Sequence, residues 1–307
     1  QIINKAIQFH LNGNIQEATK YYQKLMSQGC SDYRVFSNYG VILQGNGKLQ
    51  EAENFFRKAI GLNPDFADAH SNLGNILRDL GKYKEAELST RKAIELNPYL
   101  AVAHSNLGSI LRDLGRLDES FDSYFRVIEI NPMYSNIYPV ITRFLKGSDL
   151  SKLNKSKLIK VLNILLERND VPHKELFNAF NFVYRHQIIS NLEKSFIEFS
   201  KIQLLTNNKD ILNALKKIIF SDPKLEDMLT KVRRNICDRI AKDIEKINDF
   251  EILFVIALGE QCFINEYVYS CSKQEKLSIK KIKNRCINEE INEIDKSILS
   301  CYFPLYK

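Results

Sequence analysis

Three asparagines, Asn38, Asn72 and Asn106, follow one another at intervals of 34 residues. A carboxamide carries one acceptor oxygen and an NH₂ group with two donors, so it can bond to both the N–H and the C=O of an extended peptide. Packed helices lie roughly 8–10 Å apart and an extended chain advances about 3.3 Å per residue, which places one asparagine at about every third ligand residue. The spacing therefore predicts a surface that binds peptide backbone.

Other polar residues are expected on the same surface. In the segment that holds Asn72, the residues Asn75 and Asp79 follow at the third and seventh positions, which share one face of a helix. The expected peptide-binding face is Asn38, Asn72, Asn75, Asp79, Asn106, Ser109 and Asp113. The alternative is that these side chains are merely solvated or cap neighbouring turns. The row Val41, Asn75 and Ser109 changes between copies, so it is where we expect ligand selectivity.

A 34-residue repeat supplies the elements that must position these side chains. The segment AHSNLGNILRDLG at 69–81 returns at 103–115 with one change, and glycines 13, 47, 81 and 115 share the same period. Apolar residues from Ala69 onward fall in the stripe of an amphipathic helix, which Gly81 ends; a second helix runs to Asn97-Pro98. The repeat predicts four helical hairpins, at 1–32, 33–66, 67–100 and 101–134, stacked into a curved array.

The repeat resembles the tetratricopeptide repeat (TPR). That family places a large residue, Leu-Gly, a small Ala, a second Ala and a Pro in fixed order, which here reads His70, Leu73, Gly74, Ala86, Ala93 and Pro98. The resemblance covers residues 1 to about 134 and implies an all-α TPR superhelix whose inner face binds a protein or peptide. Thr90 departs from the pattern, because the family prefers an aromatic residue there.

The asparagine series is similar to the one in the TPR superhelix of O-linked N-acetylglucosamine transferases. That resemblance implies that Asn38, Asn72 and Asn106 hold the backbone of a peptide substrate.

Two other motifs resemble ligand-binding sites but are interpreted as structural. His70 and His104 stand where the TPR family has a bulky residue, so we expect them to pack between helices rather than bind a metal. The stretch Gln44–Lys48 resembles part of a phosphate-binding loop, but it falls in a turn between helices with no strand before it.

Residues 135–307 form a second, all-helical region of irregular pattern. Ten of the twelve glycines lie before residue 116, and the region after 148 has only Gly259, so the glycine-rich turn of a nucleotide-binding fold is missing. A helix over 250–269 is apolar nearly all round and is expected to be buried. Its polar residues are Glu260, Gln261, Asn265 and Glu266, for which an internal hydrogen-bonded network or an exposed rim is favoured over a site lining.

The end of this region has a second resemblance. The runs ALGEQCFINEY at 257–267 and SCYFPLY at 300–306 look like the helical segment that joins a TPR array to an S-adenosylmethionine-dependent methyltransferase domain in many bacterial proteins. The resemblance implies a catalytic domain after Lys307 that covers the C-terminal helices. It transfers no catalytic residue to this chain.

Composition excludes several classes of function. The net charge of +7 comes entirely from the second region. Its basic run at 273–285 is followed directly by acidic residues and is interpreted as a solvated helix face rather than a nucleic-acid site. The six cysteines form no CxxC pair and lie near no histidine at metal-ligand spacing, which indicates a reducing, cytoplasmic setting without a structural metal. No apolar run is long enough to span a membrane.

These observations predict a binding module with no cofactor and no catalytic residue of its own, which presents partners to a methyltransferase. Two alternatives stay open: a free-standing TPR scaffold, or the substrate-recognition arm of a protein glycosyltransferase.

Overall fold

The computed structural model describes residues 2–197, 203–218, 220–242, 249–264, 271–288 and 293–302. Within these ranges the regular structure is helical throughout, which confirms the predicted all-α fold. The chain divides into two compact units, residues 1–137 and residues 138–307, and each is described by itself.

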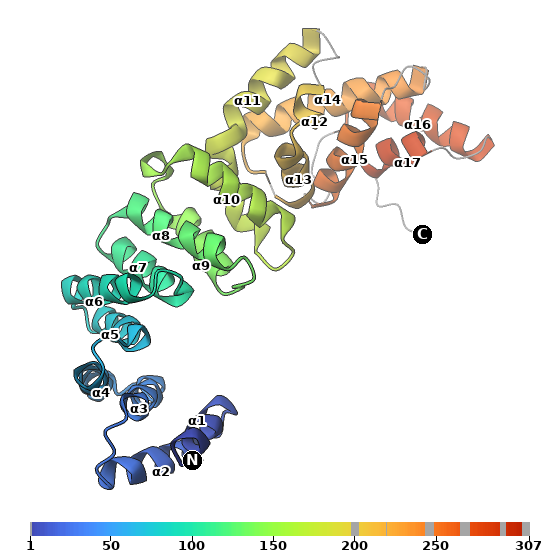
Figure 1. The fold of residues 1–307 in the computed structure, drawn as a ribbon. Coiled ribbons are helices and arrows are strands. Elements are labelled where there is room, and N and C mark those ends of the chain that lie inside the picture. Colours follow the sequence, from blue (N-terminus) through green and yellow to red (C-terminus); the bar gives the residue numbers. More distant parts are fainter. Residues whose placement is uncertain are drawn as a thin grey trace. The chain divides into compact units, whose positions relative to one another are not determined.

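The first unit is a row of four paired helices, drawn from blue to green in Figure 1. Each first helix packs against the second helix of its pair, and each second helix packs against the next pair. The pairs are α1 (Ile2–Leu11) with α2 (Ile15–Ser27), α3 (Tyr33–Gly45) with α4 (Leu49–Leu62), α5 (Ala67–Asp79) with α6 (Tyr83–Leu96), and α7 (Ala101–Asp113) with α8 (Leu117–Ile130).

Glycine forms the turn inside each pair. Gly47, Gly81 and Gly115 have φ angles of 74°, 75° and 77°, a left-handed conformation that favours glycine. The next backbone N–H then bonds back to the helix, as from Lys48 to the Leu43 carbonyl at 2.9 Å. The stretch Gln44–Lys48 is therefore a helix-ending turn, as its sequence position predicts.

A second set of glycines lets the paired helices approach closely. A Cβ atom on Gly74 would lie 2.0 Å from the Thr90 hydroxyl oxygen, and one on Gly108 would lie 2.5 Å from the Tyr124 ring. The second-helix side chains at this level, Thr90 and Tyr124 among them, are fully buried. The glycine at this position is thus needed for the close contact inside the last three hairpins.

Ion pairs join successive hairpins at equivalent positions. Glu53 in α4 accepts a bond from Lys82 at 2.9 Å, and 34 residues later Glu87 accepts one from Arg116 at 2.7 Å. Glu53 is only 4% exposed. Burial acts to raise its pKa, but the bonds from Lys82 and Arg57 outweigh that effect and hold the pKa of Glu53 below its usual range.

The second unit begins within α9 (Ile137–Gly147) and is an irregular bundle of helices (Figure 1). In the described residues α15 packs against α13 and α17, and α14 packs against α16. The remaining helices are α10 (Lys155–Glu167), α11 (Phe177–Ile197), α12 (Gln203–Thr206), α13 (Lys209–Lys217), α14 (Pro223–Lys242), α15 (Asp249–Ile264), α16 (Lys273–Asn288) and α17 (Glu293–Ser300), with short 3₁₀ turns at Leu150–Lys152 and His173–Leu176.

Helix α15 is less enclosed than its sequence suggests. Leu253 is 48% exposed, Ile256 is 37% exposed, and Glu260 also lies at the surface. Most of the helix is buried as expected, with Phe254 and Cys262 fully enclosed, but the described neighbours leave one side of it uncovered. Asn265 and Glu266 lie outside the described residues.

A buried ionic cluster links α14, α16 and the chain end. Arg233, 2% exposed, lies 3.2 Å from the Glu275 carboxylate and over the Tyr302 ring at 4.7 Å. The Tyr302 hydroxyl donates to Glu275 at 2.9 Å. Tyr302 is thus covered by helices of its own unit, and Phe303, Pro304 and Leu305 lie outside the described residues.

A candidate peptide-binding face

The predicted binding residues lie on the first helices α3, α5 and α7. Five of them are half-buried, and Asp79 and Asp113 are exposed at the helix ends. The half-buried residues are Asn38, Asn72, Asn75, Asn106 and Ser109. Along α5, the residues Asn72, Asn75 and Asp79 share one face, as their spacing requires.

Two of the three repeated asparagines already have partners in the chain. The Asn106 amide donates to the Ser71 carbonyl at 3.3 Å and to the Ser71 hydroxyl at 3.2 Å, which joins α7 to α5. Asn38 hydrogen-bonds Tyr22 in α2; burial raises the pKa of that phenol to about 12, and the bond from Asn38 acts in the opposite direction. At both places the asparagine also holds successive hairpins together.

Asn72 and Asn75 differ from the others. Within the described part of the chain, neither side-chain amide makes a hydrogen bond to another residue, although both are half-buried. A half-buried amide retains most of its bonding capacity for a ligand when no neighbour uses it. The available amide groups of the predicted face are therefore concentrated on α5.

The row at Asn75 is shaped by the residue behind it. In the last copy, the Ser109 hydroxyl lies 3.2 Å from the Tyr124 hydroxyl and also donates to the Ser105 carbonyl at 3.1 Å. One repeat earlier the equivalent of Tyr124 is Thr90, whose short side chain bonds the Ala86 carbonyl at 2.8 Å instead. Tyr124 thus hydrogen-bonds Ser109, whereas Thr90 does not bond Asn75.

Two arginines on this face were missed by the sequence interpretation. Arg78 lies 2.8 Å from the Asp79 carboxylate and 3.9 Å from that of Asp113, and Arg112 bonds Asp113 at 3.0 Å. Adjacent residues do not share a helix face, so spacing alone did not place them there, but an arginine side chain is long enough to reach. The repeated Arg-Asp pair was the signal. The carboxylates of Asp79 and Asp113 at the end of the face are consequently paired with arginines.

His70 and His104 each contact the turn that precedes their helix. Nε2 of His70 lies 2.9 Å from the Pro64 carbonyl oxygen, and Nε2 of His104 lies 3.0 Å from that of Pro98. Each ring therefore ties the start of a first helix to the preceding turn. In the described ranges, no group of three or more His, Cys, Asp or Glu side chains is arranged to hold a metal ion.

Among the described residues, no helix combines the length and apolarity that crossing a bilayer requires. The six cysteines are free thiols.

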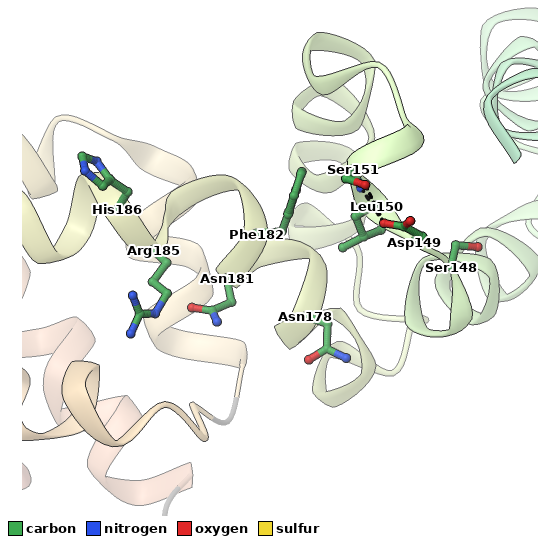
Figure 2. Close-up of a pocket in the computed structure, with 9 residues that line it drawn as sticks. All are labelled: Ser148, Asp149, Leu150, Ser151, Asn178, Asn181, Phe182, Arg185 and His186. Atoms are coloured by element: carbon green, nitrogen blue, oxygen red, sulfur yellow. Dashed lines mark hydrogen bonds between the residues drawn. The ribbon is translucent and has the colours of Figure 1, made fainter.

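The second unit has a polar depression of about 540 Å³ beside α11 (Figure 2). Arg185 pairs with Asp222, the residue before α14, at 2.5 Å, and the Arg185 and His186 side chains point in different directions. The buried Asn181 Oδ1 finds no partner within the described residues. The spacing of Asn178, Asn181 and Arg185 along one helix could have indicated this depression. Its side chains do not converge on one point, so it offers no arrangement for catalysis.

The comparisons with known proteins concern mainly the repeats. Residues 5–121 match the model of the cilia and flagella-associated protein 70 middle TPR-like domain. Over these residues the hairpins are TPR-like. No curated protein matches the chain.

Several solved TPR structures are similar to parts of the chain. YrrB, described as a TPR protein with an unusual peptide-binding site, is 18% identical, with a TM-score of 0.46, 67% of this chain and 91% of that chain covered. MamA from Desulfovibrio magneticus RS-1 is 18% identical, with a TM-score of 0.45 and coverages of 55% and 96%. The first TPR of Spaghetti (RPAP3), bound to an HSP90 peptide, is 24% identical, with a TM-score of 0.35 and coverages of 37% and 90%. Likenesses of this degree carry no inference about a shared ligand.

Proposed function

We propose that the repeat array binds an extended peptide along α3, α5 and α7 and that the chain works as a peptide-presenting module. One observation carries the proposal: Asn72 and Asn75 present, on one face of α5, half-buried amides that no described residue hydrogen-bonds. Such amides pair with a peptide N–H and C=O whatever the ligand's side chains are. Asp79 and Asp113 are already ion-paired, so the end of the face does not require basic residues in the ligand.

The test starts from peptides selected on the full chain from a random peptide library. For one selected peptide, calorimetry compares the chain with its Asn72→Ala and Asn75→Ala variants, which we expect to bind about fivefold more weakly each, the loss of one hydrogen bond of about 1 kcal/mol. Asn54→Ala is the matched control, because Asn54 is an exposed asparagine of α4 away from this face.

A second arm tests how the ligand is held. Replacing ligand side chains one by one with alanine should change the affinity little, while N-methylation of single backbone amides should weaken it. Affinity that follows ligand side chains and ignores Asn72 and Asn75 would contradict the proposal.

We also propose that this module serves an S-adenosylmethionine-dependent methyltransferase. The support is the resemblance of residues 257–267 and 300–306 to the linking segment of such proteins, of which 265–267 and 303–306 lie outside the described residues. The similarity of the asparagines to those of O-linked N-acetylglucosamine transferases supports a glycosyltransferase arm as the second candidate.

The gene beyond the codon for Lys307 separates these candidates. A strand that ends in a glycine-rich turn would support methyl transfer, and a sugar-nucleotide fold would support the glycosyltransferase. A stop codon there would contradict both and leave a free-standing adaptor.

A further inference from the structure

A second recess lies on the other side of the array, between α4 and α6. Its volume is about 470 Å³, and it is lined by apolar side chains of three helices: Ile60 from α4, Leu73 and Leu77 from α5, and Leu88 from α6. Leu88 is 71% exposed at its edge. Leu73 and Leu77 lie on a different face of α5 from Asn72 and Asn75, so the recess is separate from the proposed peptide face.

The preceding repeat shows what fits such a recess. At the position equivalent to Ser89, 34 residues earlier, stands Phe55. Its ring stacks on Phe36 with centroids 6.2 Å apart and meets the edge of Tyr39 at 4.9 Å. Phe36 and Tyr39 are the equivalents of the recess residues His70 and Leu73. The corresponding space between α2 and α4 is therefore filled by an aromatic ring from the chain itself.

The serine leaves that space open in the third repeat. The Ser89 hydroxyl donates to the His70 carbonyl at 2.9 Å, so the short side chain lies against the wall. A neighbouring change adds apolar surface, because Leu88 replaces Asn54 of the preceding repeat. The third repeat thus lacks the ring that the second repeat has at this position, and it has an exposed leucine at the edge of the opening.

The edge of the recess also carries both signs of charge. Arg57 and Glu85 form an ion pair of 3.0 Å across the opening from α4 to α6, and about half of each side chain is exposed. An apolar floor beneath a charge-balanced edge is the usual anatomy of a recess that takes one anchoring side chain.

We infer that the α4–α6 recess docks a protein partner through a phenylalanine side chain, which takes the place that Phe55 fills in the preceding repeat. The ring lies on Leu73 and Leu77, and Leu88 covers its exposed edge. The partner's adjacent backbone lies over the Arg57–Glu85 pair.

The experiment uses N-acetyl-phenylalanine amide as the probe and follows the leucine methyl groups of the full chain by NMR. The probe should shift the methyl signals of Leu73, Leu77 and Leu88 saturably, with a dissociation constant on the order of 1 mM, the range open to a ligand of this size. N-acetyl-alanine amide, the matched control, should shift them at least about tenfold more weakly, because it buries far less apolar surface.

Two variants localise the effect. Ser89→Phe places a ring from the chain in the recess and should abolish the shifts while the far-ultraviolet circular dichroism stays unchanged. Leu88→Asn copies the preceding repeat, leaves the backbone untouched, and should weaken the probe about three- to tenfold, which keeps the test sharp if Ser89→Phe folds poorly.

Several outcomes would overturn the inference. Equal binding of N-acetyl-leucine amide would mean an aliphatic occupant, and unchanged binding to Ser89→Phe and Leu88→Asn would place the probe elsewhere. A wild-type dimer that becomes a monomer in Ser89→Phe, measured by light scattering, would identify a second copy of this chain as the occupant.

Discussion

At the residue scale, Asn72 and Asn106 are equivalent in the repeat but not in their bonding. Asn106 joins α7 to Ser71, whereas Asn72 bonds no described residue. We therefore expect Asn106→Ala to lower the free energy of unfolding by about 1 kcal/mol and Asn72→Ala to leave it nearly unchanged, measured by urea denaturation.

The comparison is controlled within the chain, because the two substitutions are identical and fall at equivalent helix positions. Equal losses of stability would show that Asn72 is also a structural residue, and the peptide-binding proposal would lose its main support.

The close approach at Gly108 predicts a larger effect. Gly108→Ala puts a methyl group 2.5 Å from the buried Tyr124 ring, so the helices must separate or the ring must move. We expect a loss of about 1–3 kcal/mol in the free energy of unfolding, the usual cost of overpacking a core.

Gly61→Ala is the control for this prediction. It lies in α4, and an added Cβ there meets no atom within 4 Å. Because alanine is the better helix former, Gly61→Ala should be neutral or stabilising by up to about 1 kcal/mol. A neutral Gly108→Ala would mean that the hairpin packing is looser than the distances indicate.

At the element scale, the ion pair between hairpins can be tested against a surface pair. Glu53→Gln leaves Lys82 and Arg57 without their buried acceptor, and we expect it to lower the free energy of unfolding by roughly 1–3 kcal/mol. Glu51→Gln breaks the exposed pair with Lys48 and should change the free energy of unfolding by less than about 1 kcal/mol.

Urea denaturation of Glu53→Gln, of Lys82→Met and of the double variant gives the coupling free energy between Glu53 and Lys82. A coupling near zero would remove this pair from the contacts that hold α4 to the next hairpin.

The burial of His104 gives the array a dependence on pH, and its hydrogen bond to the Pro98 carbonyl acts in the opposite direction. Burial lowers the pKa of His104, and of His10 in α1, below the usual value, so the folded chain binds these protons less tightly than the unfolded chain. Their contribution to stability is present above the unfolded pKa and is lost as the pH falls through the folded value. We expect the melting temperature to fall between about pH 7.5 and about pH 5.5.

His104→Gln should show a smaller fall over the same interval, measured by circular dichroism at each pH. An identical fall in the chain and the variant would assign the pH dependence to other groups.

Local patterns were enough to predict the hairpins. The 34-residue glycine spacing placed the turns at Gly47, Gly81 and Gly115. The engagement of Asn106 and Ser109 could not be predicted in the same way, because each depends on a partner in another helix, Ser71 and Tyr124. Sequence spacing places a side chain on a face but does not say what already occupies it.

At the scale of the whole molecule, the two compact units predict that residues 1–137 fold without the rest. The pairs α1–α2 to α7–α8 bury their apolar residues against one another, and repeat arrays are stabilised by contacts between neighbours. A fragment of residues 1–137 should show helical circular dichroism and a cooperative thermal transition. A fragment that stays unfolded would show that the array needs the second unit.

The second unit was harder to predict than the first. Capping residues such as Asp222, which accepts a bond from the Leu225 N–H at 3.0 Å, mark where its helices begin. The exposure of Leu253 and Ile256 was not, because without a repeat nothing in the sequence says which neighbours cover a helix. The buried Gln261 is the clearest case: no described residue hydrogen-bonds its amide, although it is fully enclosed.

The ion pairs between hairpins also bear on how such a gene can change length. The acidic half of each pair, Glu53 or Glu87, belongs to one copy, and the basic half, Lys82 or Arg116, belongs to the next. An in-frame deletion of residues 67–100 would bring Glu53 opposite Arg116, and an in-frame duplication of the same segment would bring Glu87 of the first copy opposite Lys82 of the second. Unequal recombination in whole multiples of the repeat therefore restores these ion pairs between hairpins. A deletion or insertion of any other length leaves the carboxylate without its cation.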